Sequence, residues 1–360
     1  MIGGGQLALM MAEAATTLPL DLFLLAANPS DPAVRLFHDV TVGNALVSED
    51  VAAFISRVDA VTVDHELVAL DALRSDAVMV APSAEALTFA QDKAHQRREF
   101  SRAGLPVPAF IVLDAYDEAA ISDFVDGRAT TVVKAAKGGY DGRGVRVVHG
   151  DPRNDIREVL TSSAVVLEEF LELRSELAVS VVTGRDGVRV VYPPVDTEQR
   201  DGMCVSVTAP SQLPTSLQTA ATELALRVAD CVRAVGVLAI ELFVTETGLV
   251  VNEVATRPHN SGHWSIEGAV TSQFENHLRA VAGLSLGSTA LAAPLSLMVN
   301  IVGGSHEPPW NDLAELRGVY VHHYGKSFRP GRKLGHVTVT GLSPSETAET
   351  EAAIRSLLTH

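Results

Sequence analysis

Cysteine is scarce in this chain of 360 residues, which contains only Cys204 and Cys231. Two cysteines cannot build a disulfide framework or a cysteine-rich zinc site. No apolar run reaches the ~18 residues that cross a bilayer, and the first basic residue is Arg35, which argues against the charged start of a signal peptide. We therefore expect a cytoplasmic protein that does not span or bind a membrane.

Positive charge is also scarce, because 28 Lys and Arg face 44 Asp and Glu and the net charge is −16. This balance argues against general binding to nucleic acid or to anionic membranes. Only five of the basic residues are lysines, and arginine supplies the rest. Positions that retain lysine either need a compact ammonium group or kept it by chance. The five lysines are Lys93, Lys134, Lys137, Lys326 and Lys333.

The chain is nevertheless 47% hydrophobic and long enough for two or three domains. Residues 1–82 alternate short apolar strands (Leu20–Ala26, Ala60–Val63, Ala77–Val80) with helical patterns, which predicts a parallel sheet. The turn Gly3-Gly4-Gly5 opens a helix and is either an anion site or a plain tight turn. Only Met1-Ile2 precede it, so we expect a truncated first strand or a chain start placed too late.

A glycine-rich hairpin follows a helix that is predicted from Ser83, its N-cap, to about Arg102. The strand Thr131–Lys134, the turn Gly138–Gly144 and the strand Val145–Val148 predict a flap whose backbone lies over phosphates. Neither a Walker A loop nor a dinucleotide fingerprint fits, because no helix follows the glycines. An ordinary glycine-rich hairpin is the alternative.

Two further strands are predicted after the flap. The strand Val165–Leu171 contains the acidic pair Glu168-Glu169 and is followed by Glu176. This pattern suggests either an adenine and ribose site or a solvated acidic turn. The second strand, Val237–Val244, follows an amphipathic helix over 217–235 that Gly236 is expected to end.

A hairpin of Val237–Val244 with Gly248–Val254 carries the strongest physical argument. If Phe243 pairs with Val251, side-chain alternation places Glu241 opposite Glu253. Directly opposed carboxylates destabilise a sheet, unless a divalent cation such as Mg²⁺ lies between them. A shared proton or a solvated edge are the alternatives.

The segment Glu253–Trp264 is unusually dense in chemically useful side chains. Arg257 suits a carboxylate or phosphate, and His259 and Asn260 suit a planar oxyanion or a substrate amine. His263 and Trp264 either act in the site or pack to hold the loop. Near the end of the chain, the segment Lys326–His336 holds four cations and is either a phosphate site or a solvated basic loop.

These motifs resemble the ATP-grasp enzymes, and more specifically the N5-carboxyaminoimidazole ribonucleotide synthetase family of purine biosynthesis. The resemblance rests on 138–144, on Glu241-Leu242-Phe243-Val244 and Asn252-Glu253, and on the late motifs 257–264, 272–275 and 329–336. It implies an α/β and α+β architecture with an N-terminal parallel-sheet domain (1–82), a central ATP-grasp domain (83–285) and a small C-terminal domain (286–360).

The resemblance also implies a reaction and a set of site residues. ATP, bicarbonate and aminoimidazole ribonucleotide would give N5-carboxyaminoimidazole ribonucleotide, ADP and phosphate through carboxyphosphate, which carboxylates the amine directly or through released CO₂. A homodimer is implied, with Mg²⁺ on Glu241 and Glu253. Catalytic roles are implied for Arg257, His259, Asn260, Lys326 and Asp141, and substrate binding for Tyr140, Arg143 and Arg332. ATP contacts are implied for Lys93, Lys134, Gly139, Tyr140, Asp141, Gly142, Arg143, Gly144, Val145, Glu168, Glu169, Phe170, Leu171, Glu176, Gln199, Asn252 and Glu253.

The chain departs from the family pattern at a few positions. Ala8-Leu9-Met10 stands where the family usually has Gly-Arg-Met, and Thr256 stands where it tends to have Pro. These departures bear on how tightly the ribonucleotide is held. Another ATP-grasp ligase, such as a formate-dependent glycinamide ribonucleotide transformylase, and a non-catalytic nucleotide-binding relative are the alternatives.

Overall fold

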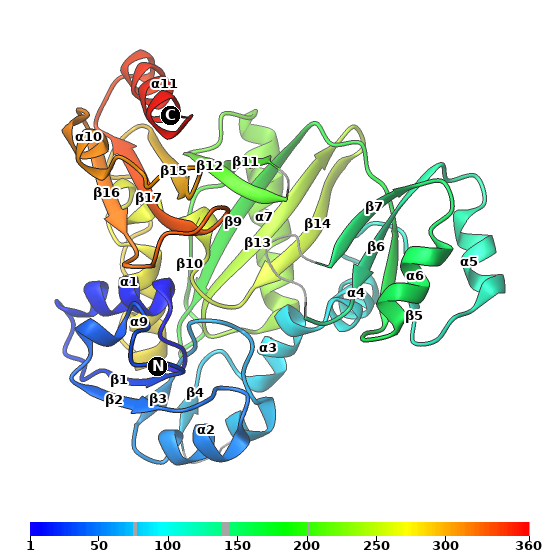
Figure 1. The fold of residues 1–360 in the computed structure, drawn as a ribbon, viewed down its shortest axis with the longest axis horizontal. Coiled ribbons are helices and arrows are strands. Elements are labelled where there is room, and N and C mark those ends of the chain that lie inside the picture. The colour runs from blue at the N-terminus through cyan, green and yellow to red at the C-terminus, as the bar shows by residue number, and fades with distance from the viewer. Residues whose placement is uncertain (75–77, 139–143, 201, 360) are drawn as a thin grey trace.

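A computed structural model describes residues 1–74, 78–138, 144–200 and 202–359 of the chain (Figure 1). Within these ranges, none of the helices combines the length and the apolar character that a membrane crossing requires. The predicted mixed α/β and α+β architecture is confirmed.

The N-terminal part forms the predicted parallel sheet. Strand β1 pairs with β2 and β3 with β4, each in parallel. Ile2 makes isolated parallel bridges to Leu25 and Val63, so the short start of the chain takes the central strand position between the two pairs. The elements of this part are α1 (Gln6–Ala15), β1 (Phe23–Ala26), η1 (Val34–Leu36), β2 (Asp39–Val42), α2 (Ser48–Ile55), β3 (Ala60–Val61), η2 (Leu70–Leu73) and β4 (Met79–Val80).

The helix predicted from Ser83 to Arg102 is in fact two helices, α3 (Ala84–Gln91) and α4 (Lys93–Arg102). Ser83 caps α3 as expected, by accepting a hydrogen bond from the backbone N–H of Ala86. Asp92 is extended (φ −130°, ψ 101°) and caps α4 with its carboxylate. The prediction of one helix was therefore wrong. The apolar pattern gave no sign of the break, because it continues on both sides of Asp92, and a new helix begins at Lys93.

A four-stranded antiparallel sheet in the order β5-β8-β6-β7 carries the predicted flap. Helices α5 and α6 pack Ile121, Phe124 and Ile156 onto it, at one end of the molecule (Figure 1). The elements are β5 (Phe110–Leu113), α5 (Glu118–Val125), β6 (Thr130–Ala135), β7 (Val145–His149), α6 (Arg153–Leu160) and β8 (Val165–Glu169).

The largest sheet forms the middle of the molecule and continues into the C-terminal part, because β12 pairs with β15. Its order is β14-β13-β9-β11-β12-β15-β17-β16, with β10 paired to β9. The strands are β9 (Ser175–Thr183), β10 (Arg189–Val191), β11 (Val195–Arg200), β12 (Met203–Ala209), β13 (Gly236–Thr245), β14 (Gly248–Ala255), β15 (Ser296–Val302), β16 (Val319–His323) and β17 (Lys333–Thr340). The domain boundaries at 82/83 and 285/286 remain predictions.

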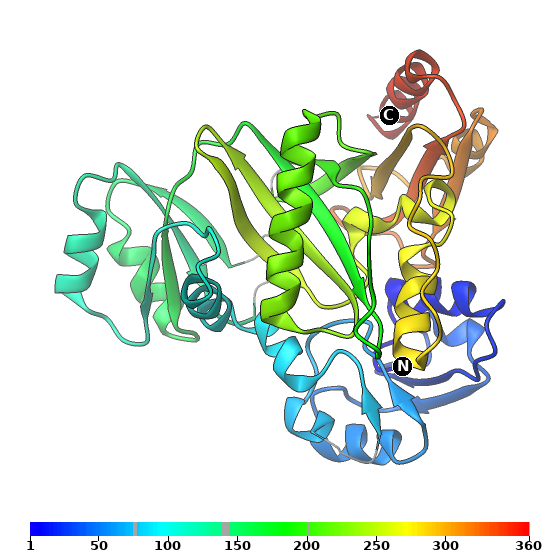
Figure 2. The ribbon, with the colours of Figure 1, turned by 180° about the vertical axis from the view of Figure 1, so that it is seen from behind.

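Helix α7 (Thr215–Val232) covers one face of this sheet, as Figure 2 shows. The helix ends at Val232 rather than at the predicted residue 235, because Arg233 adopts a left-handed conformation (φ 56°). Gly236 instead begins β13, where an added Cβ would lie 2.7 Å from the His277 ring.

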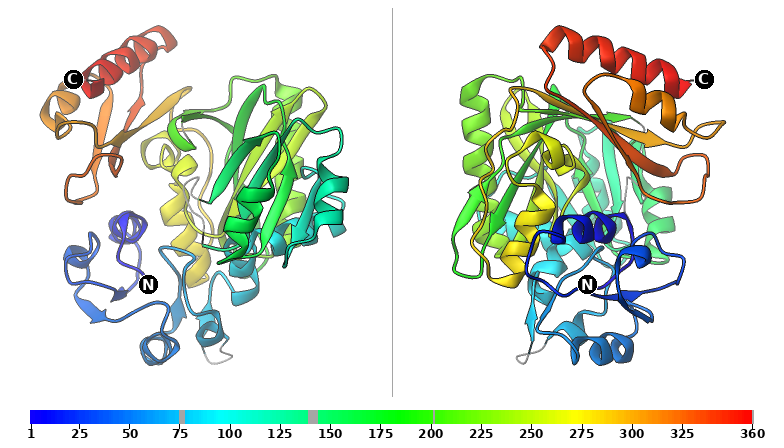
Figure 3. Two further views of the ribbon diagram at one scale, coloured as in Figure 1. Left: turned by 45° about the vertical axis from the view of Figure 1, so that its right-hand side comes forward. Right: turned by 90° about the vertical axis from the view of Figure 1, so that its left-hand side faces the viewer.

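The remaining helical elements follow β14 in the chain. They are η3 (Asn260–Gly262), α8 (Ser265–Gly268), α9 (Gln273–Ala282), α10 (Trp310–Glu315) and α11 (Pro344–Thr359). Helix α9 packs with α1 around Phe274, Leu278 and Tyr324, so segments far apart in the sequence lie side by side (Figure 3).

Candidate active site

The hairpin β13–β14 places Glu241 directly opposite Glu253, as the alternation of side chains predicted. The expected pairing of Phe243 with Val251 is wrong, because Phe243 pairs with Val250. The register shifts between Glu241 and Leu242, and Asn252 is the extra residue on β14. This β-bulge preserves the carboxylate pair while the rest of the hairpin is displaced by one residue.

The two opposed carboxylates have opposite electrostatic environments. Burial and the nearby charges of Glu253 and Glu176 raise the pKa of Glu241. Burial would also raise the pKa of Glu253, but Lys93, whose Nζ lies 3.0 Å from Glu253 Oε2, and then Lys134 lower it. The pKa of Glu176 is raised by burial and by Glu253. These three carboxylates therefore act on one another electrostatically, and Lys93 from α4 pairs with Glu253.

This donor set fits a magnesium ion that is shared with a phosphate ligand. Within the described ranges, no group of three or more His, Cys, Asp or Glu side chains is arranged to hold a metal ion. Mg²⁺ is usually held by one or two carboxylates together with substrate phosphates and water. Glu241 and Glu253 are such a pair, and burial together with the charges of Glu253 and Glu176 raises the pKa of Glu241, so a bound cation would favour its charged form.

Lys134 and Glu168 form a second charged cluster, on the flap sheet. Lys134 Nζ lies 2.8 Å from Glu168 Oε2, and Arg97 Nε lies 2.6 Å from Glu168 Oε1. Burial lowers the pKa of Lys134. Burial opposes ionisation of Glu168, but Arg97 and Lys134 outweigh it and lower the pKa of Glu168 to about 2. The ATP contact predicted for Glu168 as part of the adenine hinge remains a prediction, and its carboxylate is held by two protein cations.

The other predicted nucleotide residues lie along the flap and the strand β8. Val145 pairs with Lys134 at the base of the flap, and the Gly144 carbonyl accepts from Ala135 N–H. After β8, Phe170 is 40% exposed. Glu169 accepts a hydrogen bond from the Ala109 backbone at 2.7 Å. Leu171 follows the end of β8 and is half-buried, and so is Gln199, which pairs with Cys204. Gly139, Tyr140, Asp141, Gly142 and Arg143 lie outside the described residues.

The loop after β14 brings His259 to the carboxylate pair, with Arg257 close enough to act on its charge. His259 Nε2 lies 3.8 Å from Glu241 Oε1. Burial and then the charge of Arg257 lower the pKa of His259 to about 4, which keeps the imidazole neutral. Arg257 Nε donates to Glu66 Oε2 at 2.7 Å, so a residue of the N-terminal part orients the guanidinium.

Asn260 lies in the same loop, but its amide hydrogens point into the protein. Asn260 Nδ2 donates to Asn300 Oδ1 at 2.9 Å and to His263 Nδ1 at 3.2 Å. Asn300 returns a hydrogen bond to Asn260 Oδ1 at 2.7 Å and donates its other one to the Cys204 carbonyl. The predicted contact of Asn260 with a substrate would therefore have to use its carbonyl oxygen.

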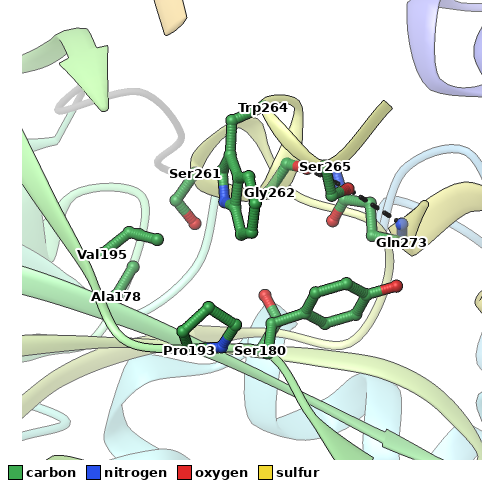
Figure 4. A pocket seen from close by; sticks show the side chains of 10 residues that line it. Ala178, Ser180, Pro193, Val195, Ser261, Gly262, Trp264, Ser265 and Gln273 are labelled. Carbon is green, nitrogen blue, oxygen red and sulfur yellow. Dashed lines mark hydrogen bonds between the residues drawn. The ribbon is translucent and has the colours of Figure 1, made fainter. Parts of the chain in front are cut away.

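His263 and Trp264 are packing residues, which decides between the two alternatives left open by the sequence. His263 is fully buried and stacks on His336 with ring centroids 4.9 Å apart. Trp264 is 1% exposed and meets Tyr192 edge to face. Figure 4 shows Trp264 with Ser261 and Gly262 on one side of a small hollow.

The C-terminal basic segment meets the start of the chain. Lys326 Nζ donates to Gln6 Oε1 at 2.5 Å, at the first residue of α1. Arg332 donates to the backbone and hydroxyl of Ser327 within its own loop. At the glycine turn, the backbone N–H groups of Gly5 and Ala8 donate to the Asp64 carboxylate at 2.6 and 3.0 Å. A protein carboxylate thus occupies one backbone donor of the predicted turn, Gly5, and one of the helix that follows it, Ala8.

Several residues of the site were missed by the sequence prediction. Lys333 acts electrostatically on both Glu241 and His259, so it lies closer to the carboxylate pair than its place in the basic segment suggested. The scarcity of lysine in this chain was the sign in the sequence that Lys333 could have a specific role. Glu66, Arg97 and Asn300 had no local signal, because their partners lie far away in the sequence.

Three family descriptions match successive parts of the chain. Residues 1–91 match the ribonucleotide synthetase preATP-grasp domain, residues 98–274 the ATP-grasp domain, and residues 296–350 the phosphoribosylaminoimidazole carboxylase C-terminal domain. These matches follow the order of the three parts of the fold.

Named relatives and solved structures agree with these matches. The N5-carboxyaminoimidazole ribonucleotide synthase of Mycobacterium tuberculosis (strain CDC 1551 / Oshkosh) is 42% identical over 100% of this chain and 87% of its own length. The crystal structure of the N5-carboxyaminoimidazole ribonucleotide synthetase from Thermus thermophilus superposes with a TM-score of 0.91 at 34% identity, covering 100% of this chain and 99% of that one.

A third match holds ligands. It is the Aspergillus clavatus synthase in complex with ADP and 5-aminoimidazole ribonucleotide, with a TM-score of 0.90 at 28% identity, covering 99% of this chain and 98% of that one. The full-length match at 42% identity, together with the fold, places this chain in the N5-carboxyaminoimidazole ribonucleotide synthase family of ATP-grasp enzymes.

Proposed function

We propose that this chain catalyses the ATP-dependent carboxylation of 5-aminoimidazole ribonucleotide with bicarbonate. The products are N5-carboxyaminoimidazole ribonucleotide, ADP and phosphate, and the reaction passes through carboxyphosphate. The observation that carries the proposal is the opposed pair Glu241 and Glu253, with Lys93 on one carboxylate and His259 3.8 Å from the other.

The charges of the reactants explain this arrangement. ATP and bicarbonate are both anions, so their approach needs cations at fixed positions. Mg²⁺ held by Glu241 and Glu253 would neutralise the β- and γ-phosphate oxygens. Lys93 and Lys134 approach from the flap side, and their partners Glu253 and Glu168 hold them in place before ATP binds.

The loop after β14 serves the acceptor half of the reaction. Arg257, oriented by Glu66, binds the bicarbonate or carboxyphosphate oxygens as a planar cation. His259 is neutral and can donate to an oxygen or accept a proton as the amine is carboxylated. Asn260 positions this loop through Asn300. Carboxylation by carboxyphosphate itself and by CO₂ released from it both fit these roles.

The proposal also covers ribonucleotide binding, nucleotide binding and the oligomeric state. Lys326 and Arg332 hold the substrate side of the site near α1, and Tyr140, Asp141 and Arg143 complete it from the flap. Glu176, Gln199 and the segment after β8 contact the nucleotide. The protein acts in the cytoplasm as a homodimer.

ADP release with each candidate substrate tests the proposal. We expect turnover only when both aminoimidazole ribonucleotide and bicarbonate are present, and the product should incorporate label from ¹⁴C-bicarbonate. Turnover with glycinamide ribonucleotide and formate, or no turnover with any acceptor, would contradict it.

A further inference from the structure

Gln273 makes two hydrogen bonds to a single residue of the proposed site, and we propose that it is a positioning residue for His259. The inference rests on the catalytic role proposed for His259. Gln273 is the first residue of α9, and its side chain is fully buried. Its Oε1 accepts from the His259 N–H at 3.0 Å, and its Nε2 donates to the His259 carbonyl at 2.7 Å.

These two bonds have the pattern of a hydrogen-bonded pair in an antiparallel sheet, in which one residue both donates to and accepts from the same partner. They hold the backbone on both sides of the His259 Cα, so φ and ψ at this residue are restrained together. Between them the imidazole is held by a bond from Nδ1 to Ser261 Oγ at 2.9 Å. Its Nε2 is thereby directed to Glu241 Oε1, at 3.8 Å.

Both the backbone and the side-chain amide of Gln273 lie against a closely packed part of the loop. The backbone N–H of Gln273 donates to Ser265 Oγ at 2.9 Å, a bond drawn in Figure 4. Ser265 Oγ in turn donates to the Gly262 carbonyl at 2.6 Å. A Cβ at Gly262 would lie 2.3 Å from Gln273 Oε1, so only glycine allows the loop to approach this amide. The loop 259–265 and the Gln273 side chain are therefore held in a single relative position.

Asn276 provides a matched control on the same helix. It is also fully buried and makes the same kind of reciprocal contact, accepting from Gly287 N–H at 2.7 Å and donating to the Gly287 carbonyl at 3.2 Å. It also donates to Tyr192 Oη. Gly287 is not a residue of the proposed site, so Asn276 has the structural role of Gln273 without the link to His259.

The experiment compares Gln273→Glu with Asn276→Asp in the full-length protein. Each substitution keeps an acceptor oxygen and removes the amide donor. We expect kcat of Gln273→Glu to fall roughly 10- to 100-fold, because a displacement of about 1 Å has effects of that size. The Kd for ADP should stay within about twofold of wild type, since the nucleotide contacts are unchanged. Asn276→Asp should lower the unfolding temperature comparably but keep kcat within about twofold.

A double-mutant cycle then identifies the route of the effect. If Gln273 acts through His259, the combined variant Gln273→Glu/His259→Ala should be no slower than His259→Ala alone. Gln273→Met repeats the comparison without adding a buried charge, and it decides the outcome if Gln273→Glu fails to fold.

Three results would overturn the inference: wild-type kcat in the Gln273 variants, an equal loss of kcat in Asn276→Asp, or full additivity in the cycle. Failure of the proposed function is distinguishable, because wild type would then show no turnover that depends on aminoimidazole ribonucleotide and bicarbonate. If only the role of His259 fails, His259→Ala would itself retain wild-type kcat.

Discussion

Glu168 and Glu241 are carboxylates with little exposure on two different sheets, and the protein treats their charges in opposite ways. Glu168, 2% exposed, is held between Arg97 and Lys134, and its pKa is lowered to about 2. Glu241, 16% exposed at its side chain, faces Glu253, and its pKa is raised. The first site is electrostatically complete without a ligand, whereas at the second site the charged form of Glu241 is disfavoured until a cation binds.

This difference separates a contribution to stability from a contribution to function. A carboxylate whose cations are supplied by the protein stabilises the fold and fixes the orientation of Lys134. A pair of carboxylates whose charge the protein does not balance destabilises the free protein and creates a site where a cation binds. Substitution of each carboxylate by its amide tests the comparison, because the two sites should then respond with opposite signs.

Glu253→Gln should have the largest effect, on activity. Loss of one carboxylate weakens the neutralisation of phosphate charge by several kcal/mol, so we expect kcat to fall by about 10³-fold. Steady-state ADP release measures the change. Glu246→Gln is the control, since Glu246 lies in the turn of the same hairpin and pairs with exposed Arg174. Full activity of Glu253→Gln would refute the metal assignment.

Glu168→Gln should instead unfold more easily. It leaves Arg97 and Lys134 without their shared carboxylate, and breaking a buried ion pair costs about 3–5 kcal/mol. Urea denaturation measures this loss. The neighbouring Glu169→Gln keeps an acceptor for the Ala109 N–H and should change the free energy of unfolding by less than about 1 kcal/mol. Equal stabilities of the two variants would contradict the difference drawn here.

The Glu168 site also predicts how stability depends on pH. The pKa of Glu168 falls from 4.5 to about 2 on folding. Its contribution is therefore fully present above pH 4.5 and is lost as the pH falls toward 2, by about 3 kcal/mol in total. Wild type and Glu168→Gln should converge in unfolding free energy over this range. A difference between them that stays constant over the whole range would show that Glu168 is not the titrating group.

Glu241→Gln should have the smallest effect on stability, and of the opposite sign. At a pH high enough to ionise both carboxylates, removing one of the two directly opposed charges should stabilise the ligand-free protein by about 0.5–1 kcal/mol. The measurement is the unfolding temperature with and without Mg²⁺ and ATP. Added Mg²⁺ and ATP should stabilise wild type more than the variant, because the variant has lost a ligand. Destabilisation of ligand-free Glu241→Gln would break the comparison.

Part of the fold followed from local pattern alone. The alternation of side chains predicted that Glu241 faces Glu253, because both strands bury one face. It did not predict the bulge at Asn252, where strict alternation ends: Val251 and Val254 lie three residues apart and are both buried. Likewise, the apolar periodicity of 83–102 continued across Asp92, where backbone conformation and a side-chain cap divide two helices.

The active site was likewise predictable only in part from the sequence. The residue types needed for ATP and an acid substrate were visible in the sequence, in the lysines, the carboxylate pair and the loop Arg257–Asn260. Whether Asn260 faces a ligand or the interior depends on Asn300, which lies 40 residues away. The sequence contained no local sign of that amide pair.

The sequence by itself determined the class of elements, the opposed carboxylates and the kind of ligand that they suit, because these depend on spacing and on side-chain chemistry. Only the tertiary structure decided the partners: Glu66 on Arg257, Lys93 on Glu253 and Gln273 on His259. The physical reason is that hydrogen bonds and ion pairs form between groups a few ångströms apart, and the packing of distant segments, not their order along the chain, sets those distances.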